Sequence, residues 1–197
     1  MASEAHTFLF MDLVGFSALT AERGDDRAAE VALSLYARVR SVLALHRGEE
    51  IKTIGDAMMI RCGDPRRAVD LGVCISEQLA GVADFPPVRV GVHTGSAVCR
   101  HSDWYGSAVN VAARLCSAAG GDEVLVSEAT RDAAGRLGHI EFGVRRLHWL
   151  KNVPEPVAAR SAARAQHASR RRRFPDFANI ARRTDAGIRM RYTEVTG

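Results

Sequence analysis

Hydrophobic and polar residues alternate along this chain with two periods, one typical of strands and one typical of helices. The expected strands are 7–13, a hairpin over 50–60 that turns at Gly55-Asp56, and 88–93, and the expected helices are 25–46 and 65–82. Asp64-Pro65 supplies the start of the second helix, and Gly48 follows the end of the first. The order strand, helix, strand, strand, helix, strand is the split pattern of ferredoxin-like sheets.

The pattern continues after residue 93 with further elements. We expect a helix over 105–119, a strand over 123–126, a helix over 127–134 that Ser127 caps, and a strand over 140–150. The predicted fold class is therefore α+β, an α/β sandwich in which a ferredoxin-like βαββαβ core carries additional C-terminal strands and helices.

Composition favours one soluble domain with an appendage. The chain has 197 residues, 47% of them hydrophobic and 25% charged, and no apolar run is long enough to span a membrane. With no signal-peptide pattern either, the expected location is cytoplasmic. The four cysteines are widely separated and are expected to be small buried hydrophobes, and the seven histidines lack the spacing of metal ligands.

Positive charge is concentrated at the C-terminus. Residues 160–197 carry a net charge of +7, including the run 170–173, whereas the rest of the chain carries −3. We therefore predict a domain over 1–160 and an Arg-rich tail over 161–197. The favoured interpretation is a solvated, poorly ordered tail, because it has few aromatic residues for stacking on bases. The alternative is docking on nucleic acid or on an anionic surface.

Two carboxylates stand where predicted strands end. Asp12 closes the first apolar run, and Asp56 lies at the turn of the hairpin. Magnesium is usually held by one or two carboxylates, with water and substrate phosphates completing its coordination, so this pair predicts a magnesium site. The alternative is that both are ordinary turn residues.

Four stretches in order carry a resemblance to a known family. They are FMDLVGFS at 10–17, KTIGDA at 52–57, RVGVHTG at 89–95 and DWYGSAVNVAAR at 103–114. Together they are similar to the motifs of class III nucleotidyl cyclase catalytic domains, most like those of bacterial adenylate cyclases. The resemblance covers about residues 7–160 and leaves out the tail.

The resemblance implies conversion of ATP to 3′,5′-cyclic AMP and pyrophosphate, with two Mg²⁺ or Mn²⁺ ions per site. Asp12 and Asp56 resemble the metal-binding aspartates, and Lys52 and Asp103 resemble the pair that selects the purine. Asn110 resembles the residue that orients the ribose, and Arg114 resembles the one that stabilises the transition state. Lys151 resembles the lysine that contacts the triphosphate. The family also implies a homodimer with composite sites, in which Asp12 and Asp56 of one chain face the other residues on its partner.

The chain departs from the family pattern at two places. The family often has Gly where Asn152 stands, and the segment between Gly95 and Asp103 is short, as in bacterial members with a shortened dimerisation arm. Two other functions stay open at this stage. One is a catalytically idle nucleotide-binding regulatory module of the same fold, and the other is nucleic-acid binding through the tail.

Overall fold

The computed structural model describes residues 4–82 and 85–165. Its helices are α1 (Phe16–His46), α2 (Pro65–Leu79), α3 (Ser107–Ala118) and α4 (Glu128–Ala134). Its strands are β1 (Ala5–Leu13), β2 (Gly48–Ile54), β3 (Ala57–Cys62), β4 (Val88–Ser96), β5 (Val98–Arg100), β6 (Asp103–Tyr105), β7 (Val124–Ser127), β8 (Ile140–Phe142), β9 (Arg146–His148) and β10 (Val157–Arg164).

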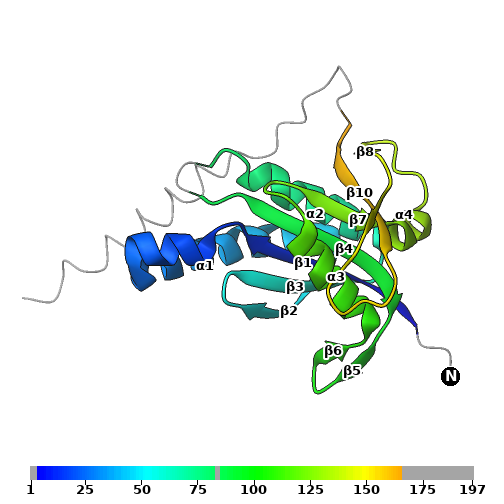
Figure 1. Ribbon diagram of the computed structural model, residues 1–197, viewed down its shortest axis with the longest axis horizontal. Coiled ribbons are helices and arrows are strands. Elements are labelled where there is room, and N and C mark those ends of the chain that lie inside the picture. The colour runs from blue at the N-terminus through cyan, green and yellow to red at the C-terminus, as the bar shows by residue number, and fades with distance from the viewer. Residues whose placement is uncertain (1–3, 83–84, 166–197) are drawn as a thin grey trace, which may run out of the picture. The chain divides into compact units, whose positions relative to one another are not determined.

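One large sheet organises the domain, with the strand order β2-β3-β1-β4-β7-β10-β8 and β9 pairing with β10 (Figure 1). The first four strands have the order β2-β3-β1-β4 and are antiparallel, whereas β4 and β7 are parallel. This arrangement confirms the predicted α+β class and its ferredoxin-like core. The strands β5 and β6 form a separate two-stranded hairpin.

The two faces of the sheet bury different cores. On one face, α1 and α2 cover the main core, which includes Leu9, Met11 and Ile60. On the other face, α3 packs on a smaller cluster that includes Phe8 and Met59. Because side chains alternate along a strand, the even-numbered residues of β1 share the face of α3. This alternation carries Asp12 to that face at the end of β1.

Local sequence signals explain how the neighbouring elements are placed. The Asp64 side chain accepts a hydrogen bond from the Arg66 amide (2.9 Å) at the start of α2, and Ser127 caps α4 in the same way through Thr130 (3.2 Å). A Cβ at Gly91 would lie only 2.1 Å from the backbone nitrogen of Cys116. The absence of a side chain at Gly91 therefore allows α3 to lie directly on β4.

The first helix is longer than predicted. It begins at Phe16 rather than Asp25, and Gly24 interrupts it with φ 80° and ψ 166°. The predicted helix is the portion after this break. The sequence Gly24-Asp25-Asp26 resembles a helix start, which is why the preceding turns were not predicted.

The predicted strand over 140–150 is wrong, because this segment forms two short strands, β8 and β9. They separate at Gly143, where the chain approaches β10 so closely that a Cβ would lie 2.3 Å from the Ser161 hydroxyl oxygen. The strand β10 itself was not predicted, because it is rich in alanine, a weak strand former. Its residue Ala159 is nevertheless completely buried.

Two further expectations concern the cysteines and the tail. Cys62, Cys74 and Cys116 are buried as predicted, but Cys99 on the β5–β6 hairpin is exposed, so the prediction is wrong for this residue. The expected domain boundary after residue 160 falls inside β10, which continues to Arg164. Residues 166–197, which make up nearly all of the Arg-rich tail, lie outside the described part.

Candidate active site

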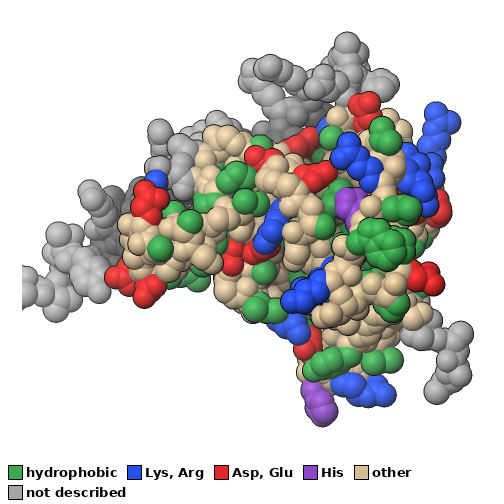
Figure 2. Space-filling model, viewed as in Figure 1, with side chains coloured by type: hydrophobic (Ala, Val, Ile, Leu, Met, Phe, Trp, Pro, Cys, Tyr) green, Lys and Arg blue, Asp and Glu red, His purple; other side chains and the backbone are tan. Residues whose placement is uncertain are grey.

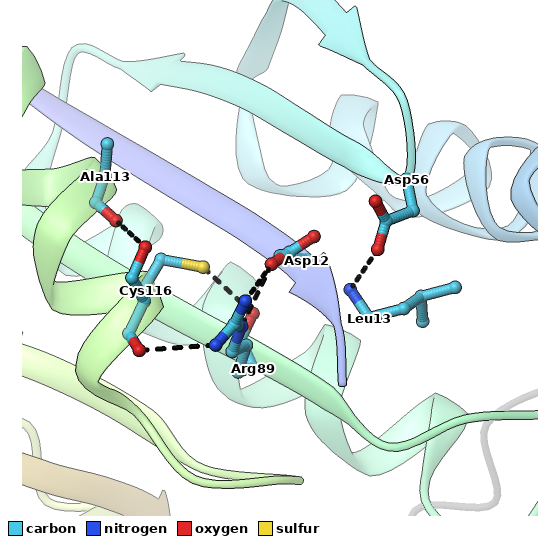
Figure 3. Close-up of polar contacts among 7 residues, drawn as sticks. Asp12, Leu13, Asp56, Arg89, Ala113 and Cys116 are labelled. Carbon is cyan, nitrogen blue, oxygen red and sulfur yellow. Dashed lines mark hydrogen bonds and ion pairs between the residues drawn. The ribbon is translucent and has the colours of Figure 1, made fainter. Parts of the chain in front are cut away.

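Asp12 is paired with an arginine on the neighbouring strand (Figure 3). The register of β1 and β4 places Asp12 directly opposite Arg89. The Arg89 guanidinium donates to Asp12 Oδ2 through Nε (3.0 Å) and also through Nη2. It donates through Nη1 to the carbonyl of Ser117 at the end of α3 (3.2 Å). Arg89 therefore connects the predicted metal-binding carboxylate to α3.

Asp56 lies beside Asp12 at the tip of the β2–β3 hairpin (Figure 3). Its Oδ2 accepts a hydrogen bond from the Leu13 amide (3.2 Å), and Gly55 turns the chain with φ +60°. The Tyr36 hydroxyl on α1 donates to the Gly55 carbonyl and ties the tip to that helix. Burial, and next the neighbouring Asp12 carboxyl, raise the pKa of Asp56 to about 6.

This arrangement suits a hard divalent cation. Asp12 and Asp56 come from a strand end and a hairpin tip, and they lie close enough for one carboxylate to disfavour ionisation of the other. A cation between them would relieve that repulsion. In the described residues, no three side chains of His, Cys, Asp and Glu form a metal cluster. Two carboxylates are the donor set expected when substrate phosphates and water supply the other ligands.

Lys52 and Asp103 form a direct pair. Lys52 Nζ on β2 lies 2.6 Å from Asp103 Oδ2 on β6, and the two side chains are 38% and 25% exposed. Asp103 Oδ1 accepts from the backbone amide of Trp104 (2.8 Å). The hydrogen bond from Lys52 is the main reason that the pKa of Asp103 is lowered. The two residues predicted to select the purine therefore lie together in one chain.

Asn110 and Arg114 lie one turn apart on α3 and are both exposed. The helix buries its opposite side through residues such as Ala112 and Leu115. No side-chain hydrogen bond or ion pair joins Asn110 or Arg114 to the rest of the described chain. Both side chains are thus available to a ligand or to another protein surface, and they are not brought into contact with Asp12 or Asp56.

Lys151 is exposed in the turn after β9. The turn is closed by a hydrogen bond from the Val153 amide to the Leu150 carbonyl (3.1 Å), and Asn152 within it has φ +61°. Asparagine tolerates this left-handed conformation better than most residues. Asn152, which stands where the family often has glycine, therefore adopts a backbone conformation that glycine would also adopt readily.

Arg89 is the site residue that sequence reasoning missed. It begins the family-like stretch 89–95, but the resemblance assigns it no role. Its importance depends on the pairing register between β1 and β4, which the sequence pattern alone does not give. The available signal is a charged side chain within the apolar strand 88–93, next to the predicted site strand 7–13.

Comparison with known proteins decides the family. Residues 2–148 match the model of the adenylate and guanylate cyclase catalytic domain. The chain belongs to this family. It therefore shares the class III cyclase domain that the four sequence stretches indicated.

Similar curated proteins are bacterial adenylate cyclases. A pH-sensitive adenylate cyclase of Mycobacterium tuberculosis is 39% identical over 129 residues, which cover 66% of this chain and 32% of that protein. An adenylate cyclase of Streptomyces coelicolor is 33% identical over 131 residues, which cover 63% of this chain and 34% of that protein. This cyclase chain thus spans about one third of the length of these relatives.

Similar solved structures support the fold. An adenylate cyclase from Trypanosoma brucei in its monomeric state has a TM-score of 0.74 at 23% identity, covering 80% of this chain and 87% of that one. The adenylyl cyclase CyaB from P. aeruginosa has a TM-score of 0.69 at 20% identity, covering 88% of this chain and all of that one. Among the described residues, no helix combines the length and the apolar content needed to cross a membrane.

Proposed function

We propose that this cyclase domain is an adenylate cyclase that converts ATP to 3′,5′-cyclic AMP and pyrophosphate. The observation that carries the proposal is the direct Lys52–Asp103 pair, in a chain that also has the Asp12–Asp56 carboxylate pair and whose curated relatives are named adenylate cyclases. In the reaction, the ribose 3′-oxygen bonds to the α-phosphorus while the bond from that phosphorus to the bridging oxygen of pyrophosphate breaks. The proton of the 3′-hydroxyl passes to water.

The base would be read by the Lys52–Asp103 pair. Asp103 accepts a hydrogen bond from the exocyclic amine of adenine, and Lys52 donates toward a ring nitrogen. Guanine would present a carbonyl to the carboxylate and an N–H to the ammonium, so both contacts would be mismatched. Mismatched polar groups discriminate strongly between substrates. The 2.6 Å contact supports this role, because it brings one acceptor and one donor side by side.

Asp12 and Asp56 would hold the divalent cations. Such cations, when bound, would lower the pKa of the 3′-hydroxyl and neutralise charge on the departing pyrophosphate. The chain's own residues then do most of the positioning. Arg89 can exchange its Asp12 partner for a phosphate oxygen, because a guanidinium pairs with phosphates as readily as with carboxylates.

Asn110 would orient the ribose and Arg114 would stabilise charge that develops on the phosphorane oxygens. Lys151 would contact the triphosphate. Since catalysis of such a displacement is mainly positioning and charge stabilisation, these exposed donors are chemically sufficient once they face the substrate.

The active unit would be a homodimer with composite sites, in which α3 of one chain faces the carboxylates of its partner. Two observations support this part of the proposal. The side chains of Asn110 and Arg114 make no hydrogen bond or ion pair with the rest of the described chain, and large hydrophobic side chains are exposed at Ile54, Val98 and Tyr105. Green side chains lie over the β5–β6 hairpin at the bottom of the view (Figure 2).

A direct assay tests this function. The purified chain is incubated with ATP and manganese or magnesium, and cyclic AMP and pyrophosphate are measured, with EDTA as the control. We expect equal amounts of both products, and none with EDTA. A folded dimeric chain that binds ATP but forms no cyclic AMP would instead be the idle regulatory module.

A further inference from the structure

Trp104 stands directly after Asp103 and is enclosed by side chains from two sheet strands. Its ring meets the His6 ring edge-on with centroids 4.3 Å apart, and it contacts the buried Phe8 ring at 5.7 Å. The Arg61 guanidinium carbon lies 5.1 Å from the centre of the same ring. We name the group formed by His6, Arg61 and Trp104 the indole clamp.

The members of the clamp are themselves fixed. Arg61 Nε donates to Glu49 Oε2 (2.8 Å) across the β2–β3 pair. Arg61 Nη1 lies 3.3 Å from His6 Nδ1. A guanidinium can only donate, so Nδ1 accepts and the His6 ring is neutral, with its proton on Nε2. The clamp thus joins β1, β2 and β3 to the indole on β6.

The indole is connected to the base-reading carboxylate through the backbone. The Trp104 amide donates to Asp103 Oδ1 (2.8 Å), while Lys52 donates to Asp103 Oδ2 (2.6 Å). The β5–β6 hairpin that carries Asp103 is not part of the main sheet. Side-chain contacts of β6 with the main sheet therefore help to fix the position of this carboxylate.

We propose that Trp104 is a positioning residue for purine selection, and that His6 and Arg61 hold it so that Asp103 stays aligned with Lys52. This inference rests on the proposed function, because it assigns a cause to the alignment of the base-reading pair. It also makes base selection sensitive to the charge of His6. A second proton on His6 would remove the acceptor for Arg61 and place two cations side by side.

The charged groups around His6 determine whether a fall or a rise in pH disturbs the clamp. Burial, and next Arg61, lower the pKa of His6, and Glu4, which directly precedes β1, opposes them. Glu49 lies behind Arg61, and the Lys52–Asp103 pair lies beyond the indole. The clamp is therefore intact near neutral pH and loosens as the solution is acidified below the ordinary histidine range.

A kinetic experiment tests the positioning role. Trp104→Leu removes the aromatic face, and Trp104→Phe keeps it. We expect Trp104→Leu to raise the KM for ATP and to lower the ATP over GTP preference by about tenfold, with a smaller change in kcat, and Trp104→Phe to restore most of the preference. An unchanged preference in an active Trp104→Leu enzyme would overturn the inference. If that variant does not fold, Arg61→Met supplies the same comparison.

A spectroscopic experiment is independent of turnover. The chain has only two tryptophans, so Trp149→Phe leaves Trp104 as the single reporter, and Trp104→Phe leaves the exposed Trp149 as a matched control. We expect the emission of Trp104 to change with a midpoint below pH 6.5, and His6→Gln to abolish that change. A pH response that survives in His6→Gln, or that is absent with His6 present, would overturn the clamp. If wild-type protein makes no cyclic AMP, the proposed function fails while this experiment still decides the clamp.

Discussion

The carboxylate end of the candidate site, formed by Asp12 and Asp56, has polar partners within one chain. The helix side, formed by Asn110 and Arg114, does not. At the carboxylate end, Asp12 is paired with Arg89, and Asp56 accepts from the Leu13 amide. On the helix side, Asn110 and Arg114 are exposed and make no side-chain polar contact with the rest of the described chain. The sheet thus holds the two carboxylates that would bind cations in fixed positions. The helix α3 carries exposed donors that would find partners only in a substrate or a second subunit.

The largest effect should come from the carboxylate end. Asp12→Ala and Asp56→Ala should each lower cyclase activity by at least about 100-fold, because charge stabilisation at the reacting phosphate is lost. Both proteins should stay folded, since these carboxylates lie at a strand end and a turn, outside the core. Cyclic AMP formation and thermal unfolding are measured together, with exposed Asp26→Ala as the control. Normal turnover in either variant would remove the metal assignment.

The second prediction asks whether the two parts of the site come from different chains. Asp12→Ala and Arg114→Ala should each be inactive alone, whereas an equal mixture under subunit exchange should recover about a quarter of wild-type activity. About half of the dimers would be mixed, and each mixed dimer would have one undamaged site. Activity of the mixture is compared with each variant alone. No recovery despite demonstrated exchange would show that each site is built within one chain.

The third prediction concerns the Lys52–Asp103 pair. Lys52→Glu combined with Asp103→Ala should lower the ATP over GTP preference by about tenfold or more, because the donor and acceptor pattern is reversed. The ratio of kcat/KM for the two nucleotides is the measurement, whatever the absolute rate. A double variant that keeps its full preference for ATP would show that the purine is read elsewhere.

The smallest effects should come from the turn after β9. Lys151→Ala should raise the KM for ATP by about tenfold through loss of a triphosphate contact. Asn152→Gly serves as its matched control and should change the free energy of unfolding by less than about 1 kcal/mol, because glycine adopts the same positive φ. If Asn152→Gly weakens ATP use as much as Lys151→Ala does, the turn backbone, rather than the lysine, determines binding.

The sequence predicted the ferredoxin-like core because strand and helix periods there are strong, and because Asp64 and Ser127 mark helix starts that the structure reproduces. It did not predict β10, in which alanines become buried only through pairing with other strands. Local propensity carries no information about such pairing.

For the candidate site, the motif residues could be predicted from the sequence, but the contacts between distant segments could not. The motifs indicate Asp12, Asp56, Lys52 and Asp103, and the structure pairs Asp12 with Asp56 and Lys52 with Asp103. The role of Arg89 required the register between β1 and β4. The contacts of Trp104 required knowledge of how the β5–β6 hairpin lies against β1 and β3. Both depend on residues far apart in the sequence, where periodicity gives no information.

The hydrogen bond from the Tyr36 hydroxyl to the Gly55 carbonyl has a mechanical consequence. Tyr36 lies near the middle of α1, and Gly55 precedes Asp56 at the hairpin tip. A displacement of α1 would therefore act directly on the hairpin tip through this hydrogen bond. The helix is thus linked directly to the backbone beside one carboxylate of the site, whereas Asp12 is held at the end of β1 by Arg89 on the neighbouring strand.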